Sequence, residues 1–355
     1  MKRLFLSLLL GILLPLAAPA QLMEDPELRD RVDQAVDRGL RFLCDTQRED
    51  GTFPGESGTT TAVPALAGMA FLSKGYVPGE GPYGEAINRS IDYILNSADM
   101  GEKSRFRGYL GYQGKGRMYA HSIATLFLSE VSGMVDPARQ KRIDEILPLA
   151  AKIILDAQAR QKRDGQDRGG WRYEPDSGDS DMSCSGWALM ALRSVRLNGG
   201  TVPDEAIEKA VSYVKRSQSP DKGGFVYRLQ EGNKHITTLT GAGILCLELC
   251  GRHNDPSSLR AARYLSRDYR NLISQPYGFY GLYYTAQGLF QIGGDLWKEF
   301  STWMYETWIP RQRPDGAWDK NEVSPYYATS MCVLAFTVPY RQLPIYQRDE
   351  TVDED

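Results

Sequence analysis

The densest group of residues that could do chemistry lies mid-chain, at 175–187. This segment, Pro-Asp-Ser-Gly-Asp-Ser-Asp-Met-Ser-Cys-Ser-Gly-Trp, carries three carboxylates, Asp176, Asp179 and Asp181. Carboxylates this close together can act as general acids or bases. The segment runs directly into an apolar helical stretch, so Asp181 could instead be an N-cap whose carboxylate accepts backbone N–H bonds. Both roles are open at this point.

Three histidines add the remaining titratable groups near neutral pH. His121 opens an apolar helical stretch and could contact a ligand, although a lone histidine there is more often a hydrogen-bonded packing residue. His235 precedes another such stretch, and we expect His253, in a polar loop, to be solvated. No Ser-His-Asp order, phosphate-binding glycine loop or dinucleotide fingerprint stands out.

Aromatic residues accompany these groups. They could line a pocket and stabilise cations through cation–π contacts, although packing between neighbouring segments explains most of them. The candidates for ligand contact are Trp171, Tyr173, Trp187, Tyr227, Tyr280, Trp318 and His121.

These residues fall at fixed places in an internal repeat. Each unit opens with an amphipathic helix that ends near a glutamine, and a glycine-aromatic turn follows. Such helices are expected at 32–47, 146–158, 206–218 and 296–312, and the turns at 50–53, 169–173, 223–227 and 315–318, with weaker versions at 108–112 and 278–280. Glycine tolerates positive φ, the aromatic ring can fill the gap between units, and the glutamine can cap a helix end.

A second, more apolar helix follows each turn. These helices are expected at 61–72, 120–131, 185–195, 238–249, 282–292 and 328–338. A helix that is apolar all round must be enclosed by protein, whereas the first helix of each unit has a charged face for solvent. An open array would need polar caps at both ends, yet the last stretch is as apolar as the others. The sequence therefore predicts an all-α (α/α)6 toroid, closed into a ring.

The two ends of the chain differ from the repeats. Lys2 and Arg3, an apolar run at 4–14 and Ala18-Pro19-Ala20 have the pattern of a cleavable signal peptide. The apolar run is too short to span a bilayer, so we expect an exported protein, periplasmic or extracellular, with no transmembrane helix in the mature chain. We assign 1–20 to the signal peptide, 21–340 to the toroid and 341–355 to an acidic tail expected to be disordered.

Composition and net charge limit the kinds of partner that we expect. The 355 residues are enough for one large domain, and a net charge of -3 from well-mixed acidic and basic residues gives no reason to expect nucleic acid. Five cysteines, an odd number spread thinly, do not suggest a disulfide framework. They are Cys44, Cys184, Cys246, Cys250 and Cys332.

The repeated glutamine, glycine and aromatic between an outer and an inner helix resembles the QW-type repeats of squalene and hopene cyclases, and the related repeats of protein prenyltransferase β-subunits. The resemblance covers roughly residues 30–340. It implies a toroid whose central cavity holds an apolar isoprenoid. Because the repeat consists of packing residues, it indicates the fold more than the function.

The cyclase resemblance implies roles in the aspartate-rich segment. Class II cyclases carry a DxDD motif whose middle aspartate is the general acid that protonates an alkene or epoxide. Asp179 matches the first position and Asp181 the catalytic one, but Met182 replaces the last aspartate. Such an acid works only if its neutral form persists, which burial or a neighbouring carboxylate such as Asp179 would favour.

The prenyltransferase resemblance implies a zinc site made by an aspartate, a cysteine two residues later and a distant histidine. Asp181 fits, but Ser183 occupies the cysteine position and Cys184 lies one residue on, about 100° around a helix. His235 has a different offset from its helix. Zinc normally needs three or four well-placed ligands, so we expect no cofactor and keep Asp181, Cys184 and His235 as the zinc candidates.

Three function classes follow. Incomplete motifs favour a degenerate repeat protein that binds an apolar, isoprenoid-like ligand or a protein partner. The second class is an active enzyme, either a cyclase-like isomerase using Asp181 or prenyltransferase-like. The third is a glycan-acting (α/α)6 hydrolase or lyase, with Asp176, Asp179 and Asp181 beside Trp171 and Tyr173.

Overall fold

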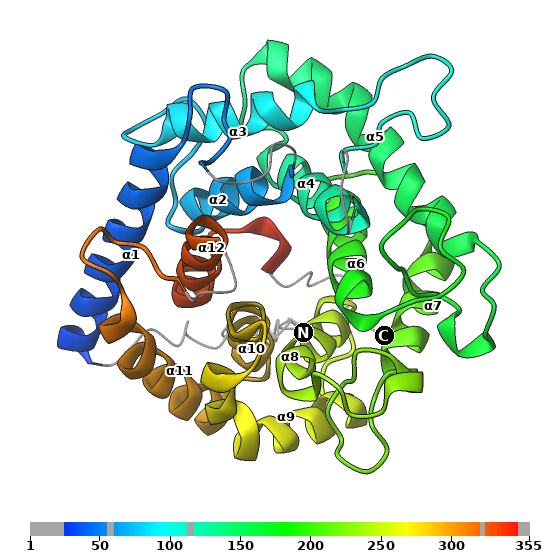
Figure 1. The fold of residues 1–355 in the computed structure, drawn as a ribbon, viewed down its shortest axis with the longest axis vertical. Helices are drawn as coiled ribbons and strands as arrows, with labels where there is room; N and C mark the ends of the chain where they lie inside the picture. The colour runs from blue at the N-terminus through cyan, green and yellow to red at the C-terminus, as the bar shows by residue number, and fades with distance from the viewer. Residues whose placement is uncertain (1–24, 55–59, 112–116, 320–323, 347–355) are drawn as a thin grey trace, which may run out of the picture.

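The computed structural model describes residues 25–54, 60–111, 117–319 and 324–346. Over these ranges the chain forms twelve α-helices and no β-strand. The odd-numbered helices make an outer ring: α1 (Pro26–Thr46), α3 (Gly84–Asn96), α5 (Pro137–Ala159), α7 (Asp204–Arg216), α9 (Pro256–Asp268) and α11 (Gly294–Trp308). The even-numbered helices lie inside it: α2 (Ala62–Ser73), α4 (Arg117–Val131), α6 (Met182–Leu197), α8 (Ile236–Leu249), α10 (Gly278–Ile292) and α12 (Pro325–Phe336) (Figure 1). The predicted (α/α)6 toroid is confirmed.

The two rings differ in burial as their sequences predict. In α8 every residue from Thr237 to Leu249 is buried. The outer helices cover the side of α8 that faces away from the centre of the toroid. In α3, Ile87, Ile91 and Ile94 form one buried face at helical spacing, and the opposite face meets solvent. Fully burying one such aliphatic side chain stabilises the fold by roughly 1.5–3 kcal/mol. The enclosed inner ring is therefore the core of the molecule.

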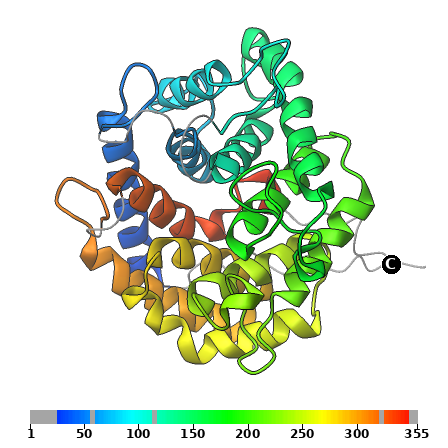
Figure 2. The ribbon, with the colours of Figure 1, turned by 45° about the vertical axis from the view of Figure 1, so that its right-hand side comes forward.

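The ring closes between the last repeat and the first. Helix α12 packs against both α2 and α1, so the last helix lies beside the first ones (Figure 2). Gln312 donates through Nε2 to the carbonyl of Ala35 at 2.8 Å, although the two residues are 277 positions apart. The same amide group donates to Gly316 O of its own turn, also at 2.8 Å. Closure therefore uses the same contact that links neighbouring repeats.

The glutamine contact recurs around the ring. Gln158 Nε2 donates to Gly169 O of its own turn at 3.0 Å and to Ala206 O of the next outer helix at 2.8 Å. Gly169 has φ +87°, and a Cβ there would lie 2.1 Å from Lys209 O. The turn therefore requires glycine both for its backbone conformation and for its close approach to α7.

The structure differs from the sequence prediction in two places. Residues 278–280, expected to form a glycine-aromatic turn, are the first residues of α10, and a 3-10 helix at Tyr269–Ser274 precedes them. Residues 341–346, which we assigned to a disordered tail, are ordered: Leu343, Ile345 and Tyr346 are buried, the last two in a 3-10 helix, Pro344–Tyr346. Apolar side chains within this short stretch explain the difference. The expected signal peptide, 1–20, and residues 347–355 lie outside the described ranges.

Two further properties bear on function. No helix within the described ranges is both long and apolar enough to span a bilayer. All five cysteines are unpaired, and four of them are buried.

Candidate functional site

The first helical turn of α6 holds Asp181, the central residue of the aspartate-rich segment. Asp181 is fully buried and is the N-cap of α6. Its Oδ1 accepts hydrogen bonds from the Cys184 N–H at 2.8 Å and from Ser183 Oγ at 2.5 Å. The capping role that the sequence suggested is therefore present.

The other oxygen of Asp181 is paired with an arginine. Arg172 Nη1 lies 2.8 Å from Asp181 Oδ2 and also donates to the Tyr227 hydroxyl. The Arg172 guanidinium lies 4.2 Å from the ring centroid of Tyr173, whose hydroxyl is 2.5 Å from that of Tyr227. Burial opposes the charge, but the hydrogen bonds to Asp181 and Tyr227 outweigh it and raise the pKa of Arg172. We call these four residues, Asp181, Arg172, Tyr173 and Tyr227, the Asp181 cluster.

Asp179, the second candidate acid, also faces arginines. Its Oδ2 lies 3.5 Å from Arg172 Nε and 3.3 Å from Arg228 Nη2. Asp179 and Asp181 therefore both form ion pairs with Arg172. The sequence pattern does not single out Arg172 or Arg228, because nothing in their spacing tells a paired arginine from a solvated one.

A buried lysine holds the loop that carries these aspartates. Lys162 Nζ donates to the carbonyls of Ser177 and Asp179, at 3.3 and 3.2 Å. Burial lowers the pKa of Lys162. At the other end of the loop, the Asp181 N–H donates to Trp171 O at 2.8 Å. The loop is therefore pinned to the repeat on both sides of Asp179.

Aromatic residues of the inner helices lie close to the Asp181 cluster. Tyr119, on α4, is half-buried and hydrogen-bonds to Ser183. Tyr280 and Tyr284, on α10, are buried, their ring centroids are 4.6 Å apart, and neither hydroxyl has a hydrogen-bond partner. Trp187, on α6, lies 5.2 Å from the Tyr284 ring, and its Nε1 also lacks a partner. We call Tyr119, Trp187, Tyr280 and Tyr284 the inner aromatic wall.

Tyr119 was not expected from the sequence, yet the repeat marks its position. Met118 N donates to Tyr173 O, and Met182 N donates to Tyr227 O, both at 2.9 Å. Tyr119 therefore occupies in α4 the place that Ser183 occupies in α6. An alignment of the repeats by their inner-helix starts would have found it.

His121, a candidate for ligand contact, makes packing hydrogen bonds. Its Nδ1 accepts from the Leu110 N–H at 3.0 Å, and its Nε2 lies 3.1 Å from Ala150 O. In the next repeat, Ser185 Oγ accepts in the same way from the Trp171 N–H at 2.9 Å. Burial lowers the pKa of His121 to about 4, so the ring is neutral near pH 7. Both ring nitrogens of His121 are therefore bonded within the protein, and neither is left for a ligand.

Two candidate tryptophans are also committed to the repeat. Trp171 Nε1 donates to Ile154 O at 2.7 Å, and Trp318 Nε1 donates to Trp308 O at 2.8 Å. Both side chains are almost fully buried. Their contacts fix an outer helix to the following turn and leave no polar atom for a ligand.

The zinc candidates Cys184 and His235 have other surroundings that the structure describes. His235 starts α8 with φ +56° and packs edge-on against Tyr227, with ring centroids 6.0 Å apart. The Cys184 thiol is buried, and burial raises its pKa. Within the described residues, no three histidine, cysteine, aspartate or glutamate side chains are placed to hold a metal ion.

No protein-family model and no curated protein sequence matches the chain. The solved structures similar to it include a terpene cyclase and a mannanase. A type II terpene cyclase, MstE, from Scytonema, in complex with geranylgeranyl dihydroxybenzoate, has a TM-score of 0.54 and 13% identity over 89% of this chain and 99% of that one. An α-1,6-mannanase, GH76A of Salegentibacter sp. HEL1_6, inactivated at two successive aspartates and bound to α-1,6-mannotriose, has a TM-score of 0.62 and 12% identity over 87% of this chain and 99% of that one.

These comparisons define the class of protein. The chain has the (α/α)6 toroid fold that the terpene cyclase and the mannanase share, which confirms the resemblance to terpenoid cyclases at the level of the fold. A fold of this kind carries unrelated activities, so the function has to be argued from the site.

Proposed function

We propose that this protein is an exported, terpenoid-cyclase-like toroid that binds an apolar, isoprenoid-like molecule at the inner aromatic wall without cyclising it. The ion pair between Asp181 and Arg172 carries the proposal. This ion pair engages Asp181, the residue to which the cyclase resemblance assigns the role of proton donor.

The contacts of Asp181 argue against proton donation. A general acid must hold a proton and point it at the substrate. Asp181 instead accepts hydrogen bonds from Arg172, Ser183 and the Cys184 N–H, so both of its carboxylate oxygens are already engaged as acceptors within the protein. Asp179 faces Arg172 and Arg228, and Met182 stands where the cyclase motif has a further aspartate.

The inner aromatic wall supports an apolar ligand. Aromatic faces offer large apolar area, and the unpaired hydroxyls of Tyr280 and Tyr284 are left to bond a polar group at one end of the ligand. Tyr119 is half-buried, so part of this wall stays within reach of a ligand. The terpene cyclase with the same fold was solved with a geranylgeranyl compound, which has this apolar character.

A glycan-acting role has less support. The similar mannanase was inactivated by replacing two successive aspartates, and this chain has no two successive aspartates. Asp176 pairs with Arg105 at 3.3 Å, while Asp179 and Asp181 pair with Arg172. No two of the three carboxylates are left free for acid and base catalysis.

Mass spectrometry of small molecules that co-purify with the exported protein tests the proposal. We expect an acyclic prenyl compound with the wild type, the same compound with Asp181→Asn, and much less of it with Tyr119→Ala. A cyclised product from the wild type that becomes acyclic with Asp181→Asn would instead identify an enzyme. The absence of any apolar compound from correctly folded wild type would also contradict the proposal. The mass of the purified chain tests cleavage after Ala20.

A further inference from the structure

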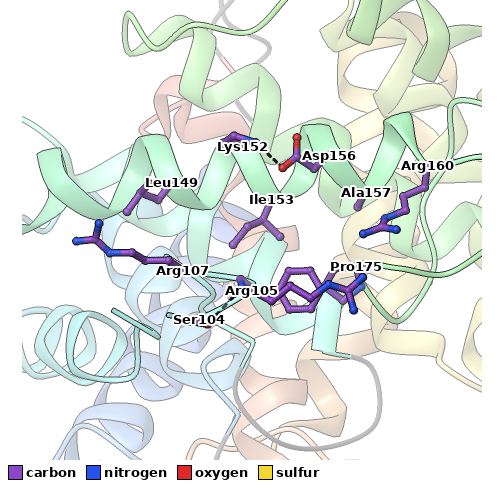
Figure 3. Close-up of a pocket in the computed structure, with 11 residues that line it drawn as sticks. Ser104, Arg105, Arg107, Leu149, Lys152, Ile153, Asp156, Ala157, Arg160 and Pro175 are labelled. Atoms are coloured by element: carbon purple, nitrogen blue, oxygen red, sulfur yellow. Dashed lines mark hydrogen bonds and ion pairs between the residues drawn. The ribbon is translucent and has the colours of Figure 1, made fainter. Parts of the chain in front are cut away.

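A pocket on the outer wall lies away from the inner aromatic wall. It is formed between α5 and the loop that leads to Leu110, and its volume is about 270 Å³. Figure 3 shows Ile153 pointing from α5 toward this loop, with Arg107 near one end and Arg160 near the other. The pocket is lined by Ser104, Arg105, Phe106, Arg107, Leu149, Lys152, Ile153, Asp156, Ala157, Arg160 and Pro175.

The floor of the pocket is apolar. Ile153 and Pro175 are buried, and Phe106 and Leu149 are half-buried, which leaves part of each of the last two side chains accessible. Apolar surface of this kind gains free energy when a ligand covers it. The floor therefore suits an alkyl or aryl group.

The rim is strongly cationic. Four basic side chains, Arg105, Arg107, Lys152 and Arg160, line the pocket against a single carboxylate, Asp156. The chain as a whole has a net charge of -3, so the rim is more positive than the molecule as a whole. A cationic rim attracts anions and repels cations.

These cations are available to a ligand. Arg105 pairs with Asp176 at 3.3 Å, Arg107 with Glu145 at 3.4 Å and Lys152 with Asp156 at 2.6 Å, and all four basic side chains are exposed. Exposed pairs of this kind contribute little, about 0–1 kcal/mol, so an incoming anion can replace a partner. Arg160 makes no ion pair or side-chain hydrogen bond with any residue in the described part of the chain.

A neighbouring groove shares the positive charge of the pocket but lacks its apolar floor. The groove between α5 and α7 has a volume of about 500 Å³ and shares Arg160. Basic residues also outnumber the acidic Glu205 and Glu208 along this groove, but its apolar side chains are limited to Ala159. The combination of an apolar floor with a cationic rim is absent there.

We propose that the outer pocket binds a small amphipathic carboxylate, with its alkyl or aryl body on Phe106, Leu149 and Ile153 and its carboxylate at Arg160. Charge complementarity selects an anion, and the volume, just below the usual lower limit of about 300 Å³ for ligand pockets, selects a small one. This proposal is independent of the proposed function, because it uses no residue of the inner aromatic wall.

Calorimetric titration of the mature protein at low salt tests it with hexanoate, octanoate, decanoate and decanol as probes. We expect affinity for the carboxylates to rise about two- to fourfold for each added methylene and decanol to bind more weakly than decanoate. Arg160→Glu should weaken decanoate binding by about fivefold or more. The matched control is Arg263→Glu, an exposed arginine on α9 across the ring, which should leave binding unchanged (Figure 1).

Three results would overturn the proposal. Decanol could bind as tightly as decanoate, which would remove the role of the cationic rim. Arg160→Glu could behave like Arg263→Glu, which would place the ligand elsewhere. Decanoate binding could be abolished by Tyr119→Ala and retained by Arg160→Glu, which would place it at the inner aromatic wall.

Discussion

Arg172 and Asp181 lie nine residues apart in the sequence and form a 2.8 Å ion pair in which the carboxylate is fully buried. The pair links the glycine-aromatic turn of the third repeat to the start of α6. A buried charge that loses its partner is strongly destabilising, because the remaining charge is neither hydrated nor compensated. The relationship therefore bears on stability as well as on function.

Replacing the arginine of this pair should destabilise the protein. We expect Arg172→Met to lower the free energy of unfolding by about 3–5 kcal/mol, because Asp181 would stay buried without its cation. Adding Asp181→Asn to Arg172→Met should recover part of the loss, since the uncompensated charge is then removed. Urea unfolding followed by tryptophan fluorescence measures both effects. A loss below about 1 kcal/mol for Arg172→Met would show that Asp181 does not depend on the pair.

The glutamine contacts should contribute similar stability wherever they occur. Gln312→Ala removes the donor to Ala35 O and Gly316 O, and Gln158→Ala removes the donor to Ala206 O and Gly169 O. Each variant should lose about 1–3 kcal/mol, because carbonyls in partly or fully buried places lose their partners. Thermal unfolding compares them with Gln161→Ala, a change at an exposed side chain. Equal stability of Gln312→Ala and the control would remove the role of this contact in closure.

A comparison of Gly169 with Gly199 separates the cost of backbone strain from the cost of close packing. Both have positive φ, +87° and +81°, but a Cβ would lie 2.1 Å from Lys209 O at Gly169 and would meet nothing within 4 Å at Gly199. Gly199→Ala should cost about 1–2 kcal/mol from conformational strain alone. Gly169→Ala should cost clearly more, since α7 must also move away. Chemical denaturation of the two variants measures the difference, and equal losses would contradict the packing argument.

A buried glutamate should make stability depend on pH. Glu130 accepts hydrogen bonds from Ser194 Oγ at 2.5 Å and from the Ile345 N–H at 3.2 Å. Burial nevertheless raises its pKa from the usual 4.5 to about 7. The pKa of Glu130 is therefore higher in the folded protein than in the unfolded chain, so the folded state is fully stable below pH 4.5, where Glu130 is protonated in both states. The free energy of unfolding then falls as the pH rises through 7.

Glu130→Gln should remove this dependence. Between pH 4.5 and 8 the wild type should lose stability relative to the variant by on the order of 3 kcal/mol. Unfolding curves at several pH values measure the change, with Glu299→Gln, an exposed glutamate on α11, as the control. A gap between wild type and Glu130→Gln that stays constant with pH would contradict the assignment.

The repeat pattern predicted the fold because each of its residues acts locally. Gly169 needs positive φ, Gln158 donates to a carbonyl of its own turn, and the inner helices are apolar on all sides. The same local logic placed Asp181 at a helix N-cap. It was wrong at 278–280, where the aromatic-rich start of α10 has the composition of a turn but is helical.

The site could be predicted only in part. Asp181, Tyr173 and Tyr227 were expected near a ligand, but their shared partner Arg172 was not, because a long, flexible side chain can reach many neighbours. The ordering of Ile345 depends on the distant Glu130, 215 residues earlier in the chain, and no local pattern reveals such a contact. Long-range polar pairing thus limits what could be inferred from spacing.

Because Gln312 joins the last repeat to Ala35 in the first helix, every repeat has two neighbours. Linear repeat arrays lose their end units first, since those units have one interface instead of two. The ring formed by the described residues has no end unit to fray, and opening any one junction weakens the repeats on both sides of it. The protein should therefore melt as a single cooperative unit rather than repeat by repeat.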